Sequence, residues 1–286
     1  MSEERVPDFL YIGTSKAGST WLFNALSRHP EVHLASDKGL YYFDAHVDRG
    51  REWYLAQFAG SGDSKAVGEI SHSYLSSPEA PARIAELNPG MRLLVCLREP
   101  VDRAFSDYLD LRKNDQFDGS FEEALETFPR LLERGRYATH LARYLEHFPR
   151  EALLVQLFDD LRADAQQYAD EVHDFLGVSP HTLPPAELRS RMPAGTPRSV
   201  ALARGAKAAS RAAKRVGLRR LRSRVKRSVS VRQLLYRPFA AEEKPVVDPT
   251  TAQQLRAHFA DEVRTLDALV GRPVAERWGY AASTAV

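Results

Sequence analysis

The segment 9–22 constrains the fold of this chain more than any other stretch, and it reads FLYIGTSKAGSTWL. A short apolar run, a turn with two glycines and a helix-compatible run predict a strand, a tight turn and an immediate helix. Such a turn points backbone N–H groups and a helix N-terminus at an anion. Lys16 precedes the second glycine, whereas nucleoside triphosphatases place the lysine after it. We therefore predict a phosphate-binding loop that is not built for a magnesium–nucleoside triphosphate.

Five apolar runs predict strands at 9–12, 32–34, 66–70, 92–97 and 153–158. Helical patterns between and after them cover 19–28, 81–87, 101–112, 121–133, 137–147, 161–176 and 250–269. Strands that alternate with helices indicate an α/β fold, here a P-loop-like parallel sheet flanked by helices. Ligands of such sheets bind beyond the carboxyl ends of the strands, where the Gly13 turn falls.

The length of 286 residues and the 43% hydrophobic content suit one large domain, which we assign to 1–286. The single cysteine, Cys96, allows no internal disulfide and fits a reducing compartment. The first residues lack a signal-peptide pattern, and no apolar run approaches the roughly 20 residues that cross a bilayer. We therefore expect a cytoplasmic protein.

The charge is distributed unevenly along the chain. The segment 188–241 holds sixteen of the 40 Lys and Arg residues and no acidic residue, so 24 basic and 38 acidic side chains remain elsewhere. Its Ala- and Arg-rich composition predicts a basic arm of one or two helices near the C-terminus. The arm is interpreted as a lid over the ligand, as an attractor of an anionic substrate or membrane surface, as a nucleic-acid binder, or as a solvated helix.

A second motif follows the apolar run 93–97 and reads REPVDRAFS from Arg98 to Ser106. Pro100 suits the first turn of a helix, which places Ser106 about two turns in and Arg98 at the end of a strand. An arginine fork and a hydroxyl form a site for a second phosphate. The alternative is a surface arginine followed by a capping proline. A nucleoside triphosphatase would place a magnesium-binding acid here instead of an arginine.

The two motifs together resemble the sulfotransferases that use 3′-phosphoadenosine 5′-phosphosulfate (PAPS). KAGSTWL at 16–22 is similar to the 5′-phosphosulfate loop of that family, and 98–106 is similar to its R-x-P-x-x-R-x-x-S motif for the 3′-phosphate. The resemblance extends through 38–44, 68–74 and 135–141, covers most of the chain to about residue 177, and is closest to the heparan-type and bacterial carbohydrate branch.

The resemblance implies a set of donor-binding residues. Lys16 would stabilise the leaving phosphate oxygen, and the loop would bind the 5′-phosphosulfate through Ala17, Gly18, Ser19, Thr20 and Trp21, with the Trp21 ring in the core. The alternative role of Ser19 is a helix N-cap. Arg98 and Ser106, with Arg198 from the basic arm, would bind the 3′-phosphate. We predict no metal, because a transferring sulfuryl group carries less negative charge than a phosphoryl group and a lysine with helix N–H dipoles holds the developing charge.

The general base is where the chain departs from this family. Related carbohydrate sulfotransferases often have Lys-Glu where this chain has Lys38-Gly39, and glycine cannot take a proton. Three candidates remain, Asp44, Glu69 and His72, of which the histidine has a suitable pKa range. Each also has a structural reading: a turn residue, a buried partner of a basic group and a solvated loop histidine, respectively.

The resemblance implies a transferase of EC 2.8.2 type that moves a sulfuryl group from PAPS to a hydroxyl, or an amine, of a carbohydrate or natural-product acceptor. The aromatic residues Tyr41, Tyr42 and Phe43, and also Tyr137 and His140, are candidates for the acceptor side. The alternatives are a P-loop small-molecule kinase and a non-catalytic nucleotide- or polyanion-binding protein. No base-reading motif supports nucleic acid as the primary partner, and the sequence leaves the oligomeric state open.

Overall fold

The computed structural model describes residues 5–188, 195–197, 236–238 and 245–281. Its main sheet is parallel and has the strand order β2-β3-β1-β4-β5. The strands are β1 (Phe9–Gly13), β2 (Val32–Leu34), β3 (Ala66–Ile70), β4 (Arg92–Leu97) and β5 (Leu153–Leu157). This confirms the predicted α/β class and all five predicted strands, although β5 ends one residue earlier than predicted.

Helices connect the strands and follow the sheet. They are α1 (Ser19–Leu26), α2 (Tyr42–Ala45), α3 (Arg51–Leu55), α4 (Ala80–Leu87), α5 (Pro100–Lys113), α6 (Phe121–Thr127), α7 (Arg130–Glu133), α8 (Tyr137–Leu145), α9 (Phe158–Ala163), α10 (Ala165–Leu176), α11 (Pro185–Leu188), α15 (Pro249–Val270) and α16 (Val274–Arg277). Short 3-10 helices are η1 (Val47–Arg49), η2 (Ala56–Phe58), η3 (Tyr74–Ser76) and η4 (Arg150–Ala152).

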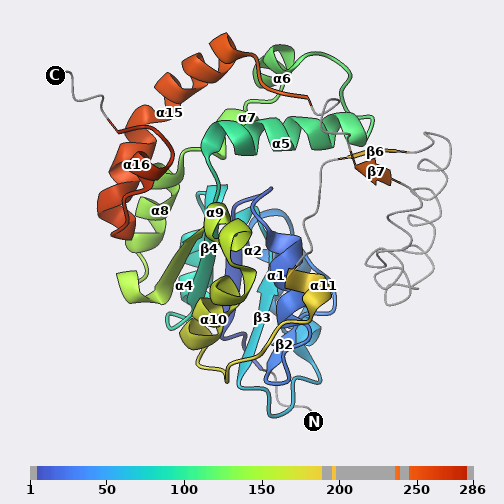
Figure 1. Ribbon diagram of the computed structural model, residues 1–286. Helices are drawn as coiled ribbons and strands as arrows, with labels where there is room; N and C mark the ends of the chain where they lie inside the picture. Colours follow the sequence, from blue (N-terminus) through green and yellow to red (C-terminus); the bar gives the residue numbers. More distant parts are fainter. Residues whose placement is uncertain (1–4, 189–194, 198–235, 239–244, 282–286) are drawn as a thin grey trace.

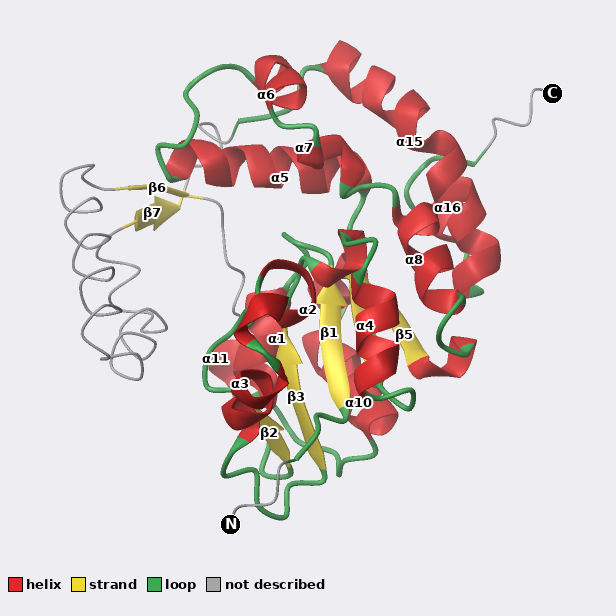
Figure 2. Ribbon diagram, turned by 180° about the vertical axis from the view of Figure 1, so that it is seen from behind, coloured by secondary structure: helices red, strands yellow, loops and turns green. Residues whose placement is uncertain are grey.

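Both faces of the sheet are covered, as Figures 1 and 2 show. Successive side chains of a strand point to opposite faces, so Phe9 and Tyr11 pack with α1 and α10. Leu10 and Ile12 pack into a second, larger core with α2, α3, α4, α5, α8 and α15. Burial on both faces explains why the strands are continuous apolar runs rather than alternating ones.

Two predicted helices are each divided in the structure. The stretch predicted at 121–133 breaks at Pro129 between α6 and α7, because proline disfavours the helical conformation of the residue before it. The stretch predicted at 161–176 breaks at Asp164, whose carboxylate accepts hydrogen bonds from Gln166 N and Gln167 N as the N-cap of α10. A proline in one case and a capping aspartate in the other therefore interrupt the helix, although the apolar pattern of the sequence continues.

The C-terminal helix α15 packs on the body as predicted. Leu255, Phe259, Val263 and Leu266 are buried along one face of it, against α5 and α8. The close approach of α15 to the connection between α7 and α8 requires glycine at position 135, since a Cβ there would lie 2.6 Å from the Phe259 ring. In the described part of the chain, no helix is both long and apolar enough to cross a membrane.

The basic arm predicted for 188–241, including Arg198, lies almost entirely outside the described residues. The described parts of this segment are the end of α11 and two strands, β6 (Gly195–Pro197) and β7 (Tyr236–Pro238). The two strands pair antiparallel beside α5 (Figure 1), a feature that the sequence analysis did not predict. The single domain and its arm stay predictions.

A cluster of histidines gives a first testable prediction. The buried His173 ring lies 4.7 Å from that of His29, with His181, Asp170 and Asp174 also nearby, and neither ring nitrogen has a hydrogen-bond partner among the described residues. Burial and His29 lower the pKa of His173 to about 4. The folded state therefore binds fewer protons than the unfolded state, and stability falls as pH drops from about 6.5 toward 4.

At pH 5 this cost reaches about 2 kcal/mol relative to pH 7. We expect His173→Leu to flatten the fall in the free energy of unfolding between pH 7 and 5, measured by urea denaturation. The matched control is His147→Leu, because His147 is exposed. An unchanged pH profile for His173→Leu would contradict the prediction.

Candidate active site

The loop between β1 and α1 forms the centre of the site. Gly18, rather than Ser19, occupies the N-cap of α1, with φ +85° and no side chain capping the helix. A Cβ on Gly18 would lie 2.6 Å from the Leu161 side chain, so both the conformation and the space require glycine. Without a side-chain cap, the first N–H groups of α1 are available to an anion.

Hydrogen bonds with β1 and β4 hold the loop in place. The Tyr11 hydroxyl donates to Thr14 O at 3.0 Å, and Thr14 N donates to Cys96 O on β4 at 2.9 Å. Lys16 has a positive φ of 67°, which L-residues rarely adopt. The Ser15 hydroxyl is buried and has no hydrogen-bond partner among the described residues. A buried, unpaired hydroxyl inside a fixed loop fits a polar ligand at this position.

The structure brings Lys16 and Arg98 together, as the sequence predicted. The guanidinium of Arg98, directly after β4, donates to Lys16 O at 3.3 Å and stacks on Phe158, 5.1 Å from the ring centroid. Lys16 Nζ forms an ion pair with Asp110 Oδ1 on α5 at 3.2 Å. Two cationic side chains thus lie at the carboxyl ends of neighbouring strands, the usual ligand position of such a sheet.

Ser106 lies on the same face of α5 as two contacts of the site. Asp102 pairs with Arg98 at 3.7 Å and Asp110 pairs with Lys16, and Ser106 is four residues from each. Residues four apart share one face of a helix, so Ser106 is on the face toward Lys16 and Arg98. Arg103 is instead fully buried, where it contacts Leu131 O and Asp107. The first arginine of the motif thus borders the site, and the second holds α5 to α7.

Lys38 belongs to the site, although the sequence analysis gave it no role. Its ammonium group donates to Ser19 Oγ at 3.0 Å and to Thr20 Oγ1 at 2.7 Å. Burial, with a smaller contribution from Lys16, lowers the pKa of Lys38 to about 8. The sequence signal for a role of Lys38 was its position at the start of the segment 38–44, which is similar to a family motif. Only the fold shows that this segment reaches α1.

Glu69 is buried at the end of β3 and surrounded by donors. Its carboxylate accepts hydrogen bonds from Tyr54 Oη at 3.2 Å, Tyr74 Oη at 2.7 Å, Ser71 Oγ at 2.7 Å and Leu40 N at 3.4 Å. Burial raises the pKa of Glu69 to about 7, against the effect of these donors. The contacts fit a structural role, fixing the segment before α2 to β3.

Among the described residues, the side chains of His72 and Asp44 have fewer hydrogen-bond partners than that of Glu69. The Nε2 atom of His72 lies 2.9 Å from Tyr41 Oη, while its Nδ1 atom is buried without a partner among the described residues. Burial and the nearby Lys38 lower the pKa of His72 to about 4. Asp44 accepts hydrogen bonds from Ser73 Oγ and from Ala45 N. Both residues lie beside the segment that carries Lys38.

Other sequence candidates are packed into the core. Tyr42 stacks on Tyr54 with ring centroids 4.5 Å apart, and Phe43 is 1% exposed, so neither ring suits an acceptor surface. Trp21 is buried against Tyr168, as expected for the core. Tyr137 and His140 are also buried, although the Tyr137 hydroxyl supports the site by donating to Arg98 O at 2.7 Å. Arg198 lies outside the described residues.

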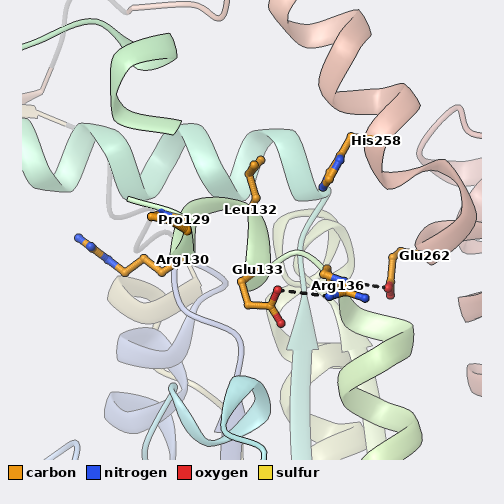
Figure 3. Close-up of a pocket in the computed structure, with 7 residues that line it drawn as sticks. All are labelled: Pro129, Arg130, Leu132, Glu133, Arg136, His258 and Glu262. Carbon is orange, nitrogen blue, oxygen red and sulfur yellow. Dashed lines mark hydrogen bonds and ion pairs between the residues drawn. The ribbon is translucent and has the colours of Figure 1, made fainter. Parts of the chain in front are cut away.

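A cavity of about 710 Å³ lies between α7, the start of α8 and α15, and Figure 3 shows the residues that line it. Its lining includes Arg130, Arg136 and His258. Arg136 contacts both Glu133 and Glu262 at 3.4 Å, so its charge is already balanced. Neither Lys16 nor Arg98 lines the cavity, and we do not place the donor there. Across the described residues, no three His, Cys, Asp or Glu side chains are grouped to hold a metal ion.

The fold and the β1–α1 loop define an α/β protein of P-loop-like architecture, with this loop at the carboxyl edge of a parallel sheet. The family model of the sulfotransferase domain matches residues 6–191. The chain therefore belongs to the sulfotransferase domain family, as its motifs predicted.

Curated relatives include two human heparan-sulfate enzymes. The chain is 33% identical over 200 residues to human bifunctional heparan sulfate N-deacetylase/N-sulfotransferase 3, which covers 62% of this chain and 23% of that protein. It is 30% identical over 184 residues to human heparan sulfate glucosamine 3-O-sulfotransferase 3B1, covering 61% of this chain and 47% of that protein. The chain thus matches less than half the length of each.

Among solved structures, the sulfotransferase from Alicyclobacillus acidocaldarius is similar over 96% of this chain and 99% of that one. The TM-score is 0.71 and the sequence identity is 24%. This similarity supports the fold over the length of the chain.

Proposed function

We propose that this chain transfers a sulfuryl group from PAPS to a hydroxyl, or an amine, of a carbohydrate or natural-product acceptor. The observation that carries the proposal is the contact between Arg98 and the Lys16 loop, which puts two cationic groups at the ends of β1 and β4. The donor has one phosphate group at each end of its ribose. Two adjoining anion sites suit it, and membership of the sulfotransferase family supports it.

The donor would be held by the loop and by α5. Backbone N–H groups from Ala17 to Thr20, with the Ser15 hydroxyl, would bind the 5′-phosphosulfate, and Arg98 with Ser106 would bind the 3′-phosphate. Lys16 would lie between these sites and hold the negative charge that develops on the leaving phosphate oxygen. Lys38 would orient the Ser19 and Thr20 hydroxyls, which it already contacts.

For the base we favour His72, and Asp44 is the second candidate. The carboxylate oxygens of Glu69 are occupied by four donors, whereas the His72 ring has one hydrogen-bond partner among the described residues, the Tyr41 hydroxyl at Nε2. A neutral imidazole takes a proton, and the low pKa of His72 keeps it neutral across the physiological range. The charged groups around His72 are Lys38, Arg134, Asp107 and Lys16.

This assignment predicts the pH dependence of turnover. A base acts in its deprotonated form, so protonation of His72 should lower kcat in a limb near pH 4 rather than near 6.5. We expect His72→Asn to lower kcat at pH 7 by about 10²-fold or more and to remove this limb, while Asp44→Asn leaves the limb in place. Circular dichroism at each pH checks that the protein is folded. Loss of the limb in Asp44→Asn alone would make Asp44 the base.

Turnover should not require a metal. We expect an unchanged initial rate after incubation with EDTA, because Lys16, Arg98 and the α1 N–H groups supply the positive potential. The measurement is sulfuryl transfer before and after chelation and desalting, with magnesium added back as the control. Loss of activity that magnesium restores would contradict the prediction.

A glycan acceptor is part of the proposal. It is supported by two relatives whose names include heparan sulfate N-sulfation and glucosamine 3-O-sulfation. Transfer of labelled sulfate to heparan-type oligosaccharides, compared with 4-nitrophenol, tests it. A preference for the phenol would replace the glycan with a small aromatic acceptor.

Calorimetry tests the donor. We expect adenosine 3′,5′-bisphosphate to bind at least tenfold more tightly than magnesium–ATP, because Arg98 would bind a 3′-phosphate that ATP does not have. Tighter binding of magnesium–ATP would instead favour a kinase, and tight bisphosphate binding without transfer would favour a non-catalytic binding protein.

We also propose a cytoplasmic setting, in line with the free, buried thiol of Cys96.

A further inference from the structure

The phenol ring of Tyr41 occupies the space beside Gly39. A Cβ built on Gly39 would lie 2.7 Å from two ring carbons of Tyr41 and 2.8 Å from its hydroxyl oxygen. The backbone of Tyr41 has φ +52°, a conformation that costs a non-glycine residue on the order of 1 kcal/mol. Position 39 thus has no side chain, and the Tyr41 ring and hydroxyl fill the space that a side chain there would need.

This placement is fixed by the end of β3. Tyr41 N donates to Ser71 Oγ at 3.1 Å, and Gly39 N donates to Ile70 O at 2.9 Å. Ser71 is in turn bound to Glu69 at 2.7 Å. The buried carboxylate therefore positions the segment that presents the phenol.

The Tyr41 hydroxyl makes its contact with His72. Tyr41 Oη and His72 Nε2 are 2.9 Å apart, and the two rings meet edge to face with centroids 5.4 Å apart. The two residues thus form a hydrogen-bonded pair through which a proton can pass. Burial raises the pKa of Tyr41 and lowers that of His72, so both are neutral at pH 7. In the tautomer with the proton on Nδ1, Nε2 accepts the phenol proton and the phenol oxygen remains free to accept another.

The pair adjoins the loop that would bind the donor. The carbonyl oxygen of His72 lies 3.1 Å from a Cβ built on Gly13, the last residue of β1. Lys38, next to Gly39, contacts Ser19 and Thr20 at the start of α1. His72 and the segment that carries Tyr41 therefore lie at the two ends of the loop that carries Lys16, one beside Gly13 and the other beside the first residues of α1.

We infer that Tyr41 receives the acceptor proton and relays it to His72, an inference that rests on the proposed sulfuryl transfer. The acceptor O–H bond breaks as its oxygen forms a bond to sulfur and the bond from sulfur to the leaving phosphate oxygen breaks. The acceptor proton passes to Tyr41 Oη, and the phenol proton passes to His72 Nε2. The imidazolium then releases its proton to solvent. Tyr41 is thus a catalytic residue for this reaction, and Ser71 and Glu69 are positioning residues.

The test compares Tyr41→Phe with Tyr108→Phe, using a heparan-type oligosaccharide as acceptor. The first change removes the hydroxyl and keeps the ring. The control removes a hydroxyl that donates to Gly119 O at 3.0 Å, before α6. We expect Tyr41→Phe to lower kcat by about 30-fold or more, with KM for the donor and the melting temperature nearly unchanged. The double variant Tyr41→Phe/His72→Asn should be no slower than the slower single variant.

A second readout separates proton transfer from a structural role. In mixtures of light and heavy water, two protons moving together give a bowed dependence of kcat on the deuterium fraction. We expect this curve for the wild type and a straight line for Tyr41→Phe. A wild-type kcat in Tyr41→Phe would overturn the relay while leaving sulfuryl transfer intact. A wild-type protein that binds no adenosine 3′,5′-bisphosphate and transfers no sulfate would overturn both.

Discussion

Replacing Lys16 with alanine is expected to lower kcat by about 10²–10³-fold, because it removes the cation that we propose holds the charge on the leaving oxygen. The lysine side chain is 26% exposed and, among the described residues, forms an ion pair with the half-exposed Asp110, so the fold loses little. We therefore expect a melting temperature within about 2 °C of the wild type. Single-turnover transfer of labelled sulfate from PAPS measures the loss directly, without a contribution from product release.

Two variants make the Lys16 result specific. Lys65→Ala removes another lysine that is held in one ion pair, with Glu31 at 2.7 Å, and should leave kcat unchanged. Lys38→Ala should lower kcat less than Lys16→Ala, since Lys38 acts through the Ser19 and Thr20 hydroxyls that it contacts. A single-turnover rate for Lys16→Ala close to the wild type would remove this residue from the mechanism.

The sheet and the loop between β1 and α1 were predictable because their signals are local. In an α/β protein, a short continuous apolar run such as 93–97 is typical of a strand that is covered on both faces. The neighbouring positions of Gly13 and Arg98 follow from the rule that parallel strands end at one edge of the sheet. The contact between Arg98 and Lys16 O is a consequence of that rule.

The acceptor side was less predictable because its contacts are nonlocal. Whether Glu69 faces solvent or four donors depends on Tyr54 and Tyr74, and no sequence period relates these residues. The same applies to Tyr41, which a run of three aromatic residues does not distinguish from Tyr42 and Phe43. A left-handed backbone at Tyr41 turns its ring to His72, while the next two rings enter the core.

Arg98→Ala is expected to weaken binding of adenosine 3′,5′-bisphosphate by roughly 30–100-fold, the effect of losing a charge-assisted hydrogen bond of about 2–3 kcal/mol. The physical reason predicts a second result. Adenosine 5′-monophosphate has no 3′-phosphate, so the same variant should bind it almost as the wild type does, and the difference between the two ligands measures the 3′ site alone.

Titration calorimetry of both nucleotides with both proteins completes this cycle, and Arg264→Ala is the control. Arg264 lies on α15, where it forms an exposed pair with Asp261 at 3.0 Å. If Arg98→Ala weakened both nucleotides equally, the arginine would act on the 5′ side, through the Lys16 carbonyl to which it donates. The 3′-phosphate site would then belong elsewhere, and the main argument for a bisphosphate donor would fail even if the loop binds phosphate.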